Sequence, residues 1–282
     1  MKVLVVGGGG REHALAWKLA QSKQVEGVIV APGNAGTALE PKVRNAPVDT
    51  GEVDALLKLA KEEHVGLTVV GPEGPLAAGI VDRFWNSGLR CFGPRKQAAR
   101  LESSKNFAKE FMVRHRIPTA HHASFTDLEE ARAYLEDVGT PIVVKADGLA
   151  AGKGVVVAQT LDEAHAAVTD MLGEHRFGEA GARVVIEEFL AGEEASFIAM
   201  VGVDGAILPL ATSQDHKARD DSDRGPNTGG MGAYSPAPVV TDAVAERVMN
   251  EVLRPVVEGL RAEGVRYSGF LYAGLMIGPD GT

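Results

Sequence analysis

The chain has 282 residues, of which 45% are hydrophobic, and its 29 Lys and Arg against 38 Asp and Glu give a formal net charge of −9. This length favours two or three domains, and this charge argues against a general nucleic-acid or membrane-surface binder, so any phosphate group must be bound locally. The single cysteine, Cys91, excludes an internal disulfide framework and suits a reducing cytosol. The first residues are too short an apolar run for a secretory signal, and no stretch approaches the roughly 18 apolar residues of a membrane span. We therefore expect a cytoplasmic protein that binds neither nucleic acid nor membrane.

Residues 1–101 alternate between apolar strands and helices. Strands are expected at 3–6, 25–31, 67–70 and 89–92. Helices are expected at 11–20, 52–64 and 75–86. This alternation predicts an α/β domain whose parallel sheet is covered on both faces.

The first strand meets a glycine-rich turn, Gly7 to Gly10, and Arg11 and Glu12 open the helix behind it. Backbone N–H groups at a helix N-terminus favour an anion. The dinucleotide pattern G-x-G-x-x-G is not satisfied, because Glu12 stands where its third glycine would be. An anionic ligand and a tight strand-to-helix turn without a ligand are both compatible with this feature.

From residue 102 the pattern changes to a linker helix, expected over 102–117, and then to a small α+β lobe, expected over 118–190. This lobe is predicted to run strand, helix, strand, loop, strand, helix, strand, with capping boxes that start helices at Thr126 and Thr160. Lys105 lies near the start of the linker helix, where a lysine is electrostatically unfavourable and an anion would be stabilising. A solvated surface lysine is the alternative.

The most informative segment joins two apolar runs, 141–144 and 155–157. Lys145 closes the first run, and the loop 146–154 contains three glycines and Lys153. Two β-branched runs around such a loop predict a hairpin whose tip lies against phosphate, because glycines let backbone N–H groups approach phosphate oxygens. A flexible hairpin with two solvated lysines is the alternative. A Walker A loop is excluded, because glycine and valines follow Lys153 where Ser or Thr and a helix would be needed.

Downstream, a strand expected at 183–188 runs into an acidic connector, which on composition alone is a solvated surface. A hairpin turn is expected at Asp204-Gly205. The stretch 211–238 has no periodicity and is predicted to be a long functional loop. A strand is expected at 267–277, and only Thr282 follows the turn behind it, so one arm of a hairpin is expected to be missing.

Three features resemble those of the ATP-grasp superfamily and follow one another in the same order. They are Lys145, the glycine loop 146–154 and the acidic connector after residue 188. The segments 7–14, 213–217 and 225–236 are similar to those of the phosphoribosylamine–glycine ligase family, and the similarity covers the whole chain. The resemblance implies a pre-ATP-grasp α/β domain over 1–101, followed by an ATP-grasp fold that mixes α/β and α+β structure. The large ATP-grasp lobe, expected over 191–282, is then incomplete at its C-terminus.

The resemblance also implies a reaction, the ATP-dependent ligation of glycine to 5-phosphoribosylamine through a glycyl phosphate. The products are glycinamide ribonucleotide, ADP and phosphate, in de novo purine biosynthesis. ATP and Mg²⁺ (or Mn²⁺) are the implied cofactors, and a monomer is the implied state. The metal ligands are expected beyond Thr282, which implies that the 282-residue form is inactive alone. Another ATP-grasp carboxylate ligase or carboxylase, and a noncatalytic nucleotide-binding module, are the alternatives.

The family's site residues transfer to matching positions in this sequence. Catalytic roles fall to Lys105, Lys145, Asp215 and His216. ATP binding is implied for Lys105, Lys145, Gly148, Ala151, Gly152, Lys153, Gly154, Glu187, Glu188, Phe189, Leu190 and Glu193, with the glycine loop as a lid that excludes water. Substrate binding is implied for Gly9, Arg11, Glu12, Asn34, Gly36, Pro72, Glu73, Asp215, Lys217, Asn227, Thr228, Gly229, Gly230 and Met231. From the residues alone, Asp215 to Lys217 are equally compatible with a salt-bridged loop tip.

Overall fold

The computed structural model describes residues 1–150, 154–174, 176, 178–221 and 224–282. The chain divides into two compact units. The first contains Met1–Arg100, Gly202–Gly205 and Val265–Phe270, and the second contains Leu101–Val201, Ala206–Gly264 and Leu271–Thr282. The predicted linker helix and small lobe both fall in the second unit, and their separation from the large lobe stays a prediction.

The first unit is built on a five-stranded parallel sheet in the order β3-β2-β1-β4-β5. Its strands are β1 (Lys2–Gly7), β2 (Gly27–Pro32), β3 (Val43–Asn45), β4 (Val65–Val70) and β5 (Cys91–Phe92). Its helices are α1 (Gly10–Ala20), the short 3-10 helix η1 (Thr37–Leu39), α2 (Val53–Glu62), α3 (Glu73–Ala78) and α4 (Ile80–Asn86). The predicted parallel sheet is confirmed, and only β3, too short for a periodic pattern, is missing from the prediction.

Side chains that alternate along β1 contribute to two separate cores. Leu4 and Val6 pack with Phe84 and its neighbours from α2 and α4. Val3 and Val5 pack on the opposite face with Ala16 of α1. Both faces of the sheet are therefore covered, which explains why its strands are continuous apolar runs.

One long helix was expected at 75–86, and the structure divides it into α3 and α4. Gly79 lies between them in the left-handed conformation, with φ of 92°. A left-handed residue ends the run of helical hydrogen bonds, and glycine adopts this conformation without a Cβ penalty. The expectation of a single helix is therefore wrong at this residue.

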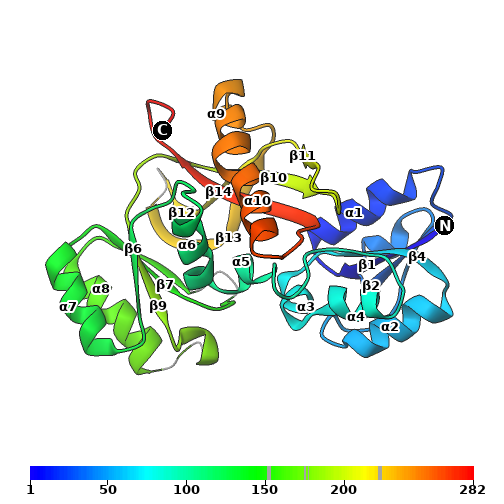
Figure 1. Ribbon diagram of the computed structural model, residues 1–282, viewed down its shortest axis with the longest axis horizontal. Coiled ribbons are helices and arrows are strands. Elements are labelled where there is room, and N and C mark those ends of the chain that lie inside the picture. The colour runs from blue at the N-terminus through cyan, green and yellow to red at the C-terminus, as the bar shows by residue number, and fades with distance from the viewer. Residues whose placement is uncertain (151–153, 175, 177, 222–223) are drawn as a thin grey trace. The chain divides into compact units, whose positions relative to one another are not determined.

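The second unit contains a four-stranded antiparallel sheet in the order β6-β9-β7-β8. Its strands are β6 (His122–Phe125), β7 (Ile142–Ala146), β8 (Val155–Ala158) and β9 (Val184–Glu188). Helices α7 (Leu128–Val138) and α8 (Leu161–Val168) lie on one side of it (Figure 1), and their buried side chains share a core with β7 and β9. Short helices α5 (Arg100–Ser103), η2 (Thr169–Gly173) and η3 (Gly178–Gly181) and the longer α6 (Lys105–Arg114) complete this part of the chain. The predicted order of strands and helices over 118–190 is confirmed.

The two predicted helix starts differ in outcome. Thr160 caps α8 as expected, because its hydroxyl oxygen accepts from the N–H of Glu163 at 3.3 Å. Helix α7 is capped by Asp127 rather than Thr126, since the Asp127 carboxylate accepts from the N–H groups of Glu129 and Glu130. A carboxylate that accepts from two unpaired N–H groups at a helix N-terminus is stabilised by the helix dipole as well.

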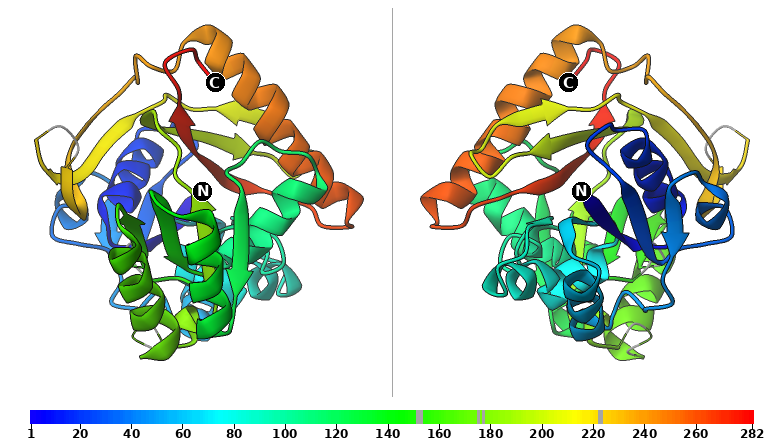
Figure 2. Two further views of the ribbon diagram at one scale, coloured as in Figure 1. Left: turned by 90° about the vertical axis from the view of Figure 1, so that its left-hand side faces the viewer. Right: turned by 90° about the vertical axis from the view of Figure 1, so that its right-hand side faces the viewer.

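The rest of the second unit combines a sheet in the order β11-β10-β14 with a long helical segment. The strands are β10 (Glu193–Val201), β11 (Ile207–Pro209) and β14 (Gly269–Ile277), and β10 pairs with β11 around the expected turn. Helices α9 (Asp242–Arg247), η4 (Val248–Leu253) and α10 (Arg254–Ala262) follow one another without a break, as the orange ribbon in Figure 2 shows. No helix in the described parts of the chain is long and apolar enough to cross a membrane.

The stretch 211–238 was expected to be an irregular loop, and this expectation is wrong. It contains β12 (Gln214–Asp220) and β13 (Arg224–Tyr234), which pair as an antiparallel ribbon. The ribbon is largely exposed and its register shifts on both sides of Ala218. It therefore needs no alternation of apolar and polar residues, and that alternation is the signal by which a strand is recognised in a sequence.

Candidate functional site

In the first unit, candidate residues gather where the parallel strands end. The order of the strands reverses between β1 and β4, and open α/β sheets bind ligands at such a point, beyond the carboxyl ends of their strands. The loops that follow β1, β2 and β4, together with the first turns of α1 and α3, carry seven residues predicted to bind substrate: Gly9, Arg11, Glu12, Asn34, Gly36, Pro72 and Glu73. The structure thus brings together residues that are more than 60 positions apart in the sequence.

Glu12 is buried at this point, with 3% of its surface exposed. Its Oε2 atom accepts from the N–H of Gly9 at 2.7 Å, whereas its Oε1 atom has no hydrogen-bond partner. A Cβ at Gly71 would lie 2.1 Å from Oε1, and a Cβ at Gly7 would lie 2.3 Å from Glu12 Cγ, so these glycines make room for the side chain. A buried acceptor without a donor is costly, and a ligand hydroxyl or amine would remove that cost.

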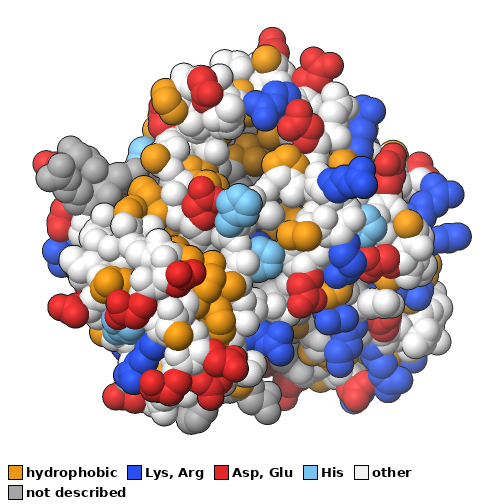
Figure 3. Space-filling model, turned by 60° about the vertical axis from the view of Figure 1, so that its left-hand side comes forward, with side chains coloured by type: hydrophobic (Ala, Val, Ile, Leu, Met, Phe, Trp, Pro, Cys, Tyr) orange, Lys and Arg blue, Asp and Glu red, His pale blue; other side chains and the backbone are white. Residues whose placement is uncertain are grey.

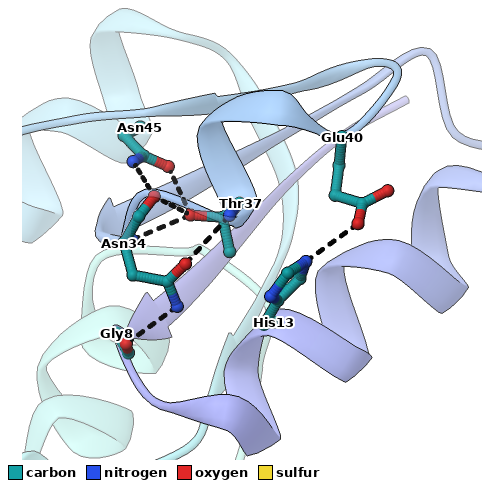
Figure 4. A network of polar contacts seen from close by, with 6 residues as sticks. All are labelled: Gly8, His13, Asn34, Thr37, Glu40 and Asn45. Carbon is teal, nitrogen blue, oxygen red and sulfur yellow. Dashed lines mark hydrogen bonds and ion pairs between the residues drawn. The ribbon is translucent and has the colours of Figure 1, made fainter.

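Asn34 connects the loops instead of presenting its amide to a ligand. Its Nδ2 donates to the carbonyl of Gly8 at 3.0 Å, and its Oδ1 accepts from the N–H of Thr37 at 2.9 Å. Asn45 reinforces the turn, because its Nδ2 donates to the Asn34 carbonyl at 2.7 Å and its Oδ1 accepts from the Thr37 hydroxyl (Figure 4). The side chain of Asn34 therefore holds the loop after β2 against the loop after β1.

Two further pairs lie at the same edge of the sheet. Nε2 of His13 on α1 lies 2.9 Å from Oε1 of Glu40, behind the loop that Asn34 organises (Figure 4). Nη2 of Arg11 lies 3.7 Å from Oε2 of Glu73, and both of these side chains are exposed. Sequence reasoning missed His13, although it lies in the same glycine-rich motif as Glu12.

In the second unit, the register of the β6-β9-β7-β8 sheet separates its side chains into two faces. Ile186 and Val144 belong to the core beneath α7 and α8. Glu187 lies opposite Val143, and Lys145 lies opposite Val155, so these four side chains share the other face. We call this other face the open face, because Lys145, Val143 and Val155 are only partly buried and Val157 is 42% exposed.

Three charged side chains meet on the open face. Oε2 of Glu187 lies 2.9 Å from Nζ of Lys145 and 2.9 Å from Nζ of Lys109 on helix α6. Burial by itself would raise the pKa of Glu187, but the charges of Lys145 and Lys109 outweigh burial and lower this pKa. Sequence reasoning missed Lys109, although its position one helical turn after Lys105 places both lysines on one side of α6.

The glycine loop is fixed to the start of α6 by Asp147. Its carboxylate accepts from the hydroxyl of Ser104 at 3.1 Å and from the N–H of Asn106 at 2.8 Å, and its carbonyl accepts from the N–H of Lys105 at 3.1 Å. Nζ of Lys105 donates to the carbonyl of Gly148 at 3.1 Å, and burial lowers the pKa of Lys105. A negative charge at the N-terminus of a helix is stabilising. No local pattern around Asp147 signals this contact, because its partners lie 41 to 43 positions away.

The residues predicted in the ribbon are divided between its two faces. Asp215 and Lys217 lie on the same side of β12, where Nζ of Lys217 contacts the carboxylates of Glu194 and Asp215, the latter at 3.6 Å. His216 points to the opposite side, with its ring 5.6 Å from that of Tyr234. Asp215 and His216, both predicted to be catalytic, are therefore not brought together.

A hydrogen-bond chain continues from Asp215 into the neighbouring strands. The hydroxyl of Ser196 on β10 donates to Asp215 Oδ1 at 3.4 Å and lies 3.3 Å from the hydroxyl of Tyr272 on β14. Burial alone would lower the pKa of Lys217, but the hydrogen bond with Glu194 and the negative charges of Glu194 and Asp215 together outweigh burial, and the pKa is raised. Glu194 and Tyr272 are further residues that the sequence analysis did not assign.

The remaining predicted residues occupy exposed positions or lie outside the described residues. Glu188, Phe189, Leu190 and Glu193 are exposed along the connector between β9 and β10, with Phe189 and Leu190 at 38% and 39%. The hydroxyl of Thr228 is used within the ribbon, where it donates to the Lys217 carbonyl and accepts from the N–H of Gly230. Gly229 and Met231 are exposed beside it, and Asn227 lies opposite Ala218. Gly148 and Gly154 flank the loop tip, whose residues Ala151, Gly152 and Lys153 lie outside the described residues.

The face of the molecule drawn in Figure 3 shows no single sign of charge. Lys and Arg side chains lie among Asp and Glu side chains over the face drawn in Figure 3. Among the described residues, no three His, Cys, Asp or Glu side chains gather as a potential metal site. Positive charge is instead concentrated locally, by Lys105, Lys109 and Lys145 around the open face.

The fold and the open face together define the ATP-grasp class of proteins. The family model described as phosphoribosylglycinamide synthetase, ATP-grasp (A) domain, matches residues 103–282, and the N domain of the same synthetase matches residues 1–102. The fold is also similar to that of a biotin carboxylase in a β,γ-ATP complex from Campylobacter jejuni, with a TM-score of 0.73 over 100% of this chain and 63% of that one, at 14% identity.

Closer relatives narrow the class to one family. A phosphoribosylamine–glycine ligase of Allochromatium vinosum is 67% identical over 283 residues, which cover 100% of this chain and 66% of the relative. The crystal structure of phosphoribosylamine–glycine ligase from Thermotoga maritima is 36% identical, with a TM-score of 0.84 over 99% of this chain and 66% of that one. The chain belongs to the phosphoribosylglycinamide synthetase family. It spans 66% of the length of these two relatives.

We predict that Asp147→Ala destabilises the second unit by about 1 kcal/mol, because the N–H of Asn106 at the start of α6 and the hydroxyl of Ser104, the N-cap residue, both lose their acceptor. Amide hydrogen exchange should accelerate at Asn106. Asp127→Ala is the matched control, since Asp127 caps α7 with the same chemistry, and it should accelerate exchange at Glu129 and Glu130 instead. Denaturant titration and residue-resolved exchange measure both effects. Unchanged exchange at Asn106 in the Asp147 variant would contradict the role assigned to this carboxylate.

Proposed function

We propose that this chain carries the ATP site and the phosphoribosylamine site of an ATP-dependent ligase that joins glycine to 5-phosphoribosylamine. The observation that carries the proposal is the open face, where a sheet with partly exposed valines presents Lys145 next to a glycine loop anchored at Asp147. Membership of the phosphoribosylglycinamide synthetase family and the ligase names of the relatives support this choice of substrates.

The open face is suited to ATP in both shape and charge. Val143, Val155 and Val157 offer a flat apolar surface on which an adenine ring can lie. Lys145 and Lys105 offer ammonium groups for the phosphates, and a pKa of Lys105 that is lowered by burial signals a site that an anion would stabilise. The exposed Phe189 and Leu190 of the connector supply further apolar contacts beside the adenine, and Glu193 is available to the ribose hydroxyls.

In the first unit, the place where the strand order reverses between β1 and β4 is suited to phosphoribosylamine. The unpaired Oε1 atom of Glu12 is a buried acceptor for an amine or a ribose hydroxyl. The N–H groups of Gly8 and Gly10 lie at the start of α1, where the helix dipole favours the 5′-phosphate. Arg11 adds a positive charge at the same edge of the sheet.

The proposed reaction proceeds in two steps because a carboxylate is a poor electrophile. A carboxylate oxygen of glycine attacks the γ-phosphorus of ATP, so that a P–O bond forms, the bond to ADP breaks and glycyl phosphate results. The amine nitrogen of phosphoribosylamine then attacks the acyl carbon, the C–O bond to phosphate breaks, and a proton leaves the nitrogen. Lys105 and Lys145 would neutralise the charge that develops on the phosphates.

A divalent metal ion belongs to the proposal, since Mg²⁺ or Mn²⁺ would neutralise charge between the transferred phosphates. Among the described residues, no three potential ligands of such an ion gather. A cytoplasmic monomer is also part of the proposal. The single cysteine, Cys91, is free and buried, which agrees with the cytoplasmic part of this proposal, because disulfides are rare in a reducing compartment.

A chimera tests the proposed function directly. We expect that this chain, placed in the Allochromatium vinosum ligase in exchange for the matching part, sustains ADP release that requires both glycine and phosphoribosylamine. Steady-state ADP formation is measured with each substrate omitted in turn and with other carboxylates in place of glycine. A chimera that melts normally yet releases ADP independently of glycine, or with another carboxylate, would exclude the proposed reaction.

We expect Lys145→Met to weaken ATP binding about tenfold to a hundredfold, because a charge-assisted hydrogen bond to phosphate contributes about 1.5–3 kcal/mol. The methionine keeps the apolar stem, so the melting temperature should change little. Lys58→Met, at a side chain that is 75% exposed on α2, is the matched control and should leave ATP affinity unchanged. ATP affinity is measured by calorimetric titration. Equal affinity in the native chain and in both variants would show that Lys145 is not part of the ATP site.

Glu12→Gln should weaken binding of glycinamide ribonucleotide about tenfold and leave ATP affinity unchanged. The amide oxygen can still accept from the N–H of Gly9, but a second acceptor is replaced by a donor at the position of Oε1. Glu26→Gln makes the same chemical change at an exposed side chain of the first unit, 77% exposed, and serves as the control. Calorimetry with the ribonucleotide and with ATP separates the two sites. A loss confined to ATP would reverse the assignment of Glu12.

A further inference from the structure

Lys109 is a buried charge that the proposed reaction leaves without a role. Its side chain is 8% exposed, and its Nζ atom contacts three oxygens. These are Glu187 Oε2 at 2.9 Å, the hydroxyl of Thr119 at 2.8 Å and the carbonyl of Ala120 at 3.4 Å. A lysine so enclosed is too far from solvent to bind a diffusing ligand. Its effect on a ligand must therefore pass through its partners.

The partner that matters is Glu187, whose Oε2 atom is shared between two ammonium groups. Lys109 and Lys145 lie at equal distances of 2.9 Å from it, but the side chain of Lys145 is 27% exposed. The three groups together carry one excess positive charge. Because Lys109 supplies the buried counter-charge, the excess charge lies on the exposed member, Lys145.

Without Lys109 the balance on the open face would change. Glu187 would remain a buried carboxylate with Lys145 as its nearest cation, and a buried charge whose partner is removed is strongly unfavourable. Lys145 would then be held by Glu187 as a neutral pair. An anionic ligand would have to compete with that carboxylate for the ammonium group.

We propose that Lys109 is a positioning residue for nucleotide phosphate: it neutralises Glu187, so that Lys145 keeps its direction and its charge for the phosphates of ATP. This inference rests on the proposed function, because it takes the open face to be the ATP site. It assigns a role to a residue that touches neither ATP nor either substrate. The lowered pKa of Glu187 agrees with a carboxylate that stays ionised between its two lysines.

The test compares ATP, ADP and adenosine, which share the same nucleoside and differ only in the number of phosphate groups. For Lys109→Met in the 282-residue chain, we expect ATP affinity to fall about tenfold or more, while adenosine affinity stays unchanged, because only the phosphate contacts pass through Lys145. The double variant Lys109→Met with Glu187→Gln removes the competing carboxylate as well, and should restore most of the ATP affinity. Lys58→Met is again the exposed control. Calorimetry with ATP, ADP and adenosine gives the three affinities for each form.

Each outcome decides a separate point. Equal losses for ATP and adenosine would show that Lys109 only supports the fold, and would overturn the inference. Unchanged ATP affinity in the single variant, or no recovery in the double variant, would overturn it too. If Lys109→Met does not fold, the double variant replaces it in the test, because it has no unpaired buried charge. The inference then requires that the double variant bind ATP and adenosine with the native ratio of affinities. A native chain that binds neither ligand would overturn the proposed function and this inference together, whereas normal native binding with an unaffected variant would overturn only the inference.

Discussion

The carboxylate of Glu187 is the interaction on which the second unit depends. It sits on β9, the strand between β6 and β7, and it contacts Lys109 of α6 and Lys145 of β7 at the same oxygen atom. The buried carboxylate of Glu187 needs a cation beside it, since desolvation of an unpaired charge would cost several kcal/mol, and Lys109 supplies a cation that is buried with it. One side chain therefore fixes the helix, the central strand and the lysine of the open face relative to one another.

The same sheet shows how one antiparallel layer serves two purposes. Its inner face, with Ile186 and Val144, is packed beneath α7 and α8 and supplies the core of this part of the chain. Its open face carries charges and partly exposed valines, which contribute little to the core. Core packing and the charged side chains of the open face are thus distributed over alternate residues of the same strands.

Much of the fold was predictable because its signals are local. The parallel sheet of the first unit, the hairpin around the glycine loop and the order of elements over 118–190 follow from apolar runs and turn residues, and all are confirmed. The ribbon of β12 and β13 was missed because its strands are exposed and rich in glycine, and the break at Gly79 was missed because glycine inside a helical pattern gives a weak signal. For the candidate site, motifs identified Lys105, Lys145 and Glu12. Asp147, Lys109 and Tyr272 were missed, because their roles depend on contacts with residues distant in the sequence, which only the folded chain reveals.

The space around Glu12 has a consequence for how this family can vary. A methyl group at Gly71 would overlap Oε1 of Glu12, and one at Gly7 would overlap its Cγ, so either glycine can be enlarged only if the glutamate side chain leaves its present position. Gly7 also has φ of 133°, which restricts it independently. Substitution at these three positions is therefore coupled: we expect a relative with a larger residue at position 71 to have lost the glutamate as well. Such paired changes would identify, from sequences alone, the family members in which the space beneath the first strand-to-helix turn is filled differently.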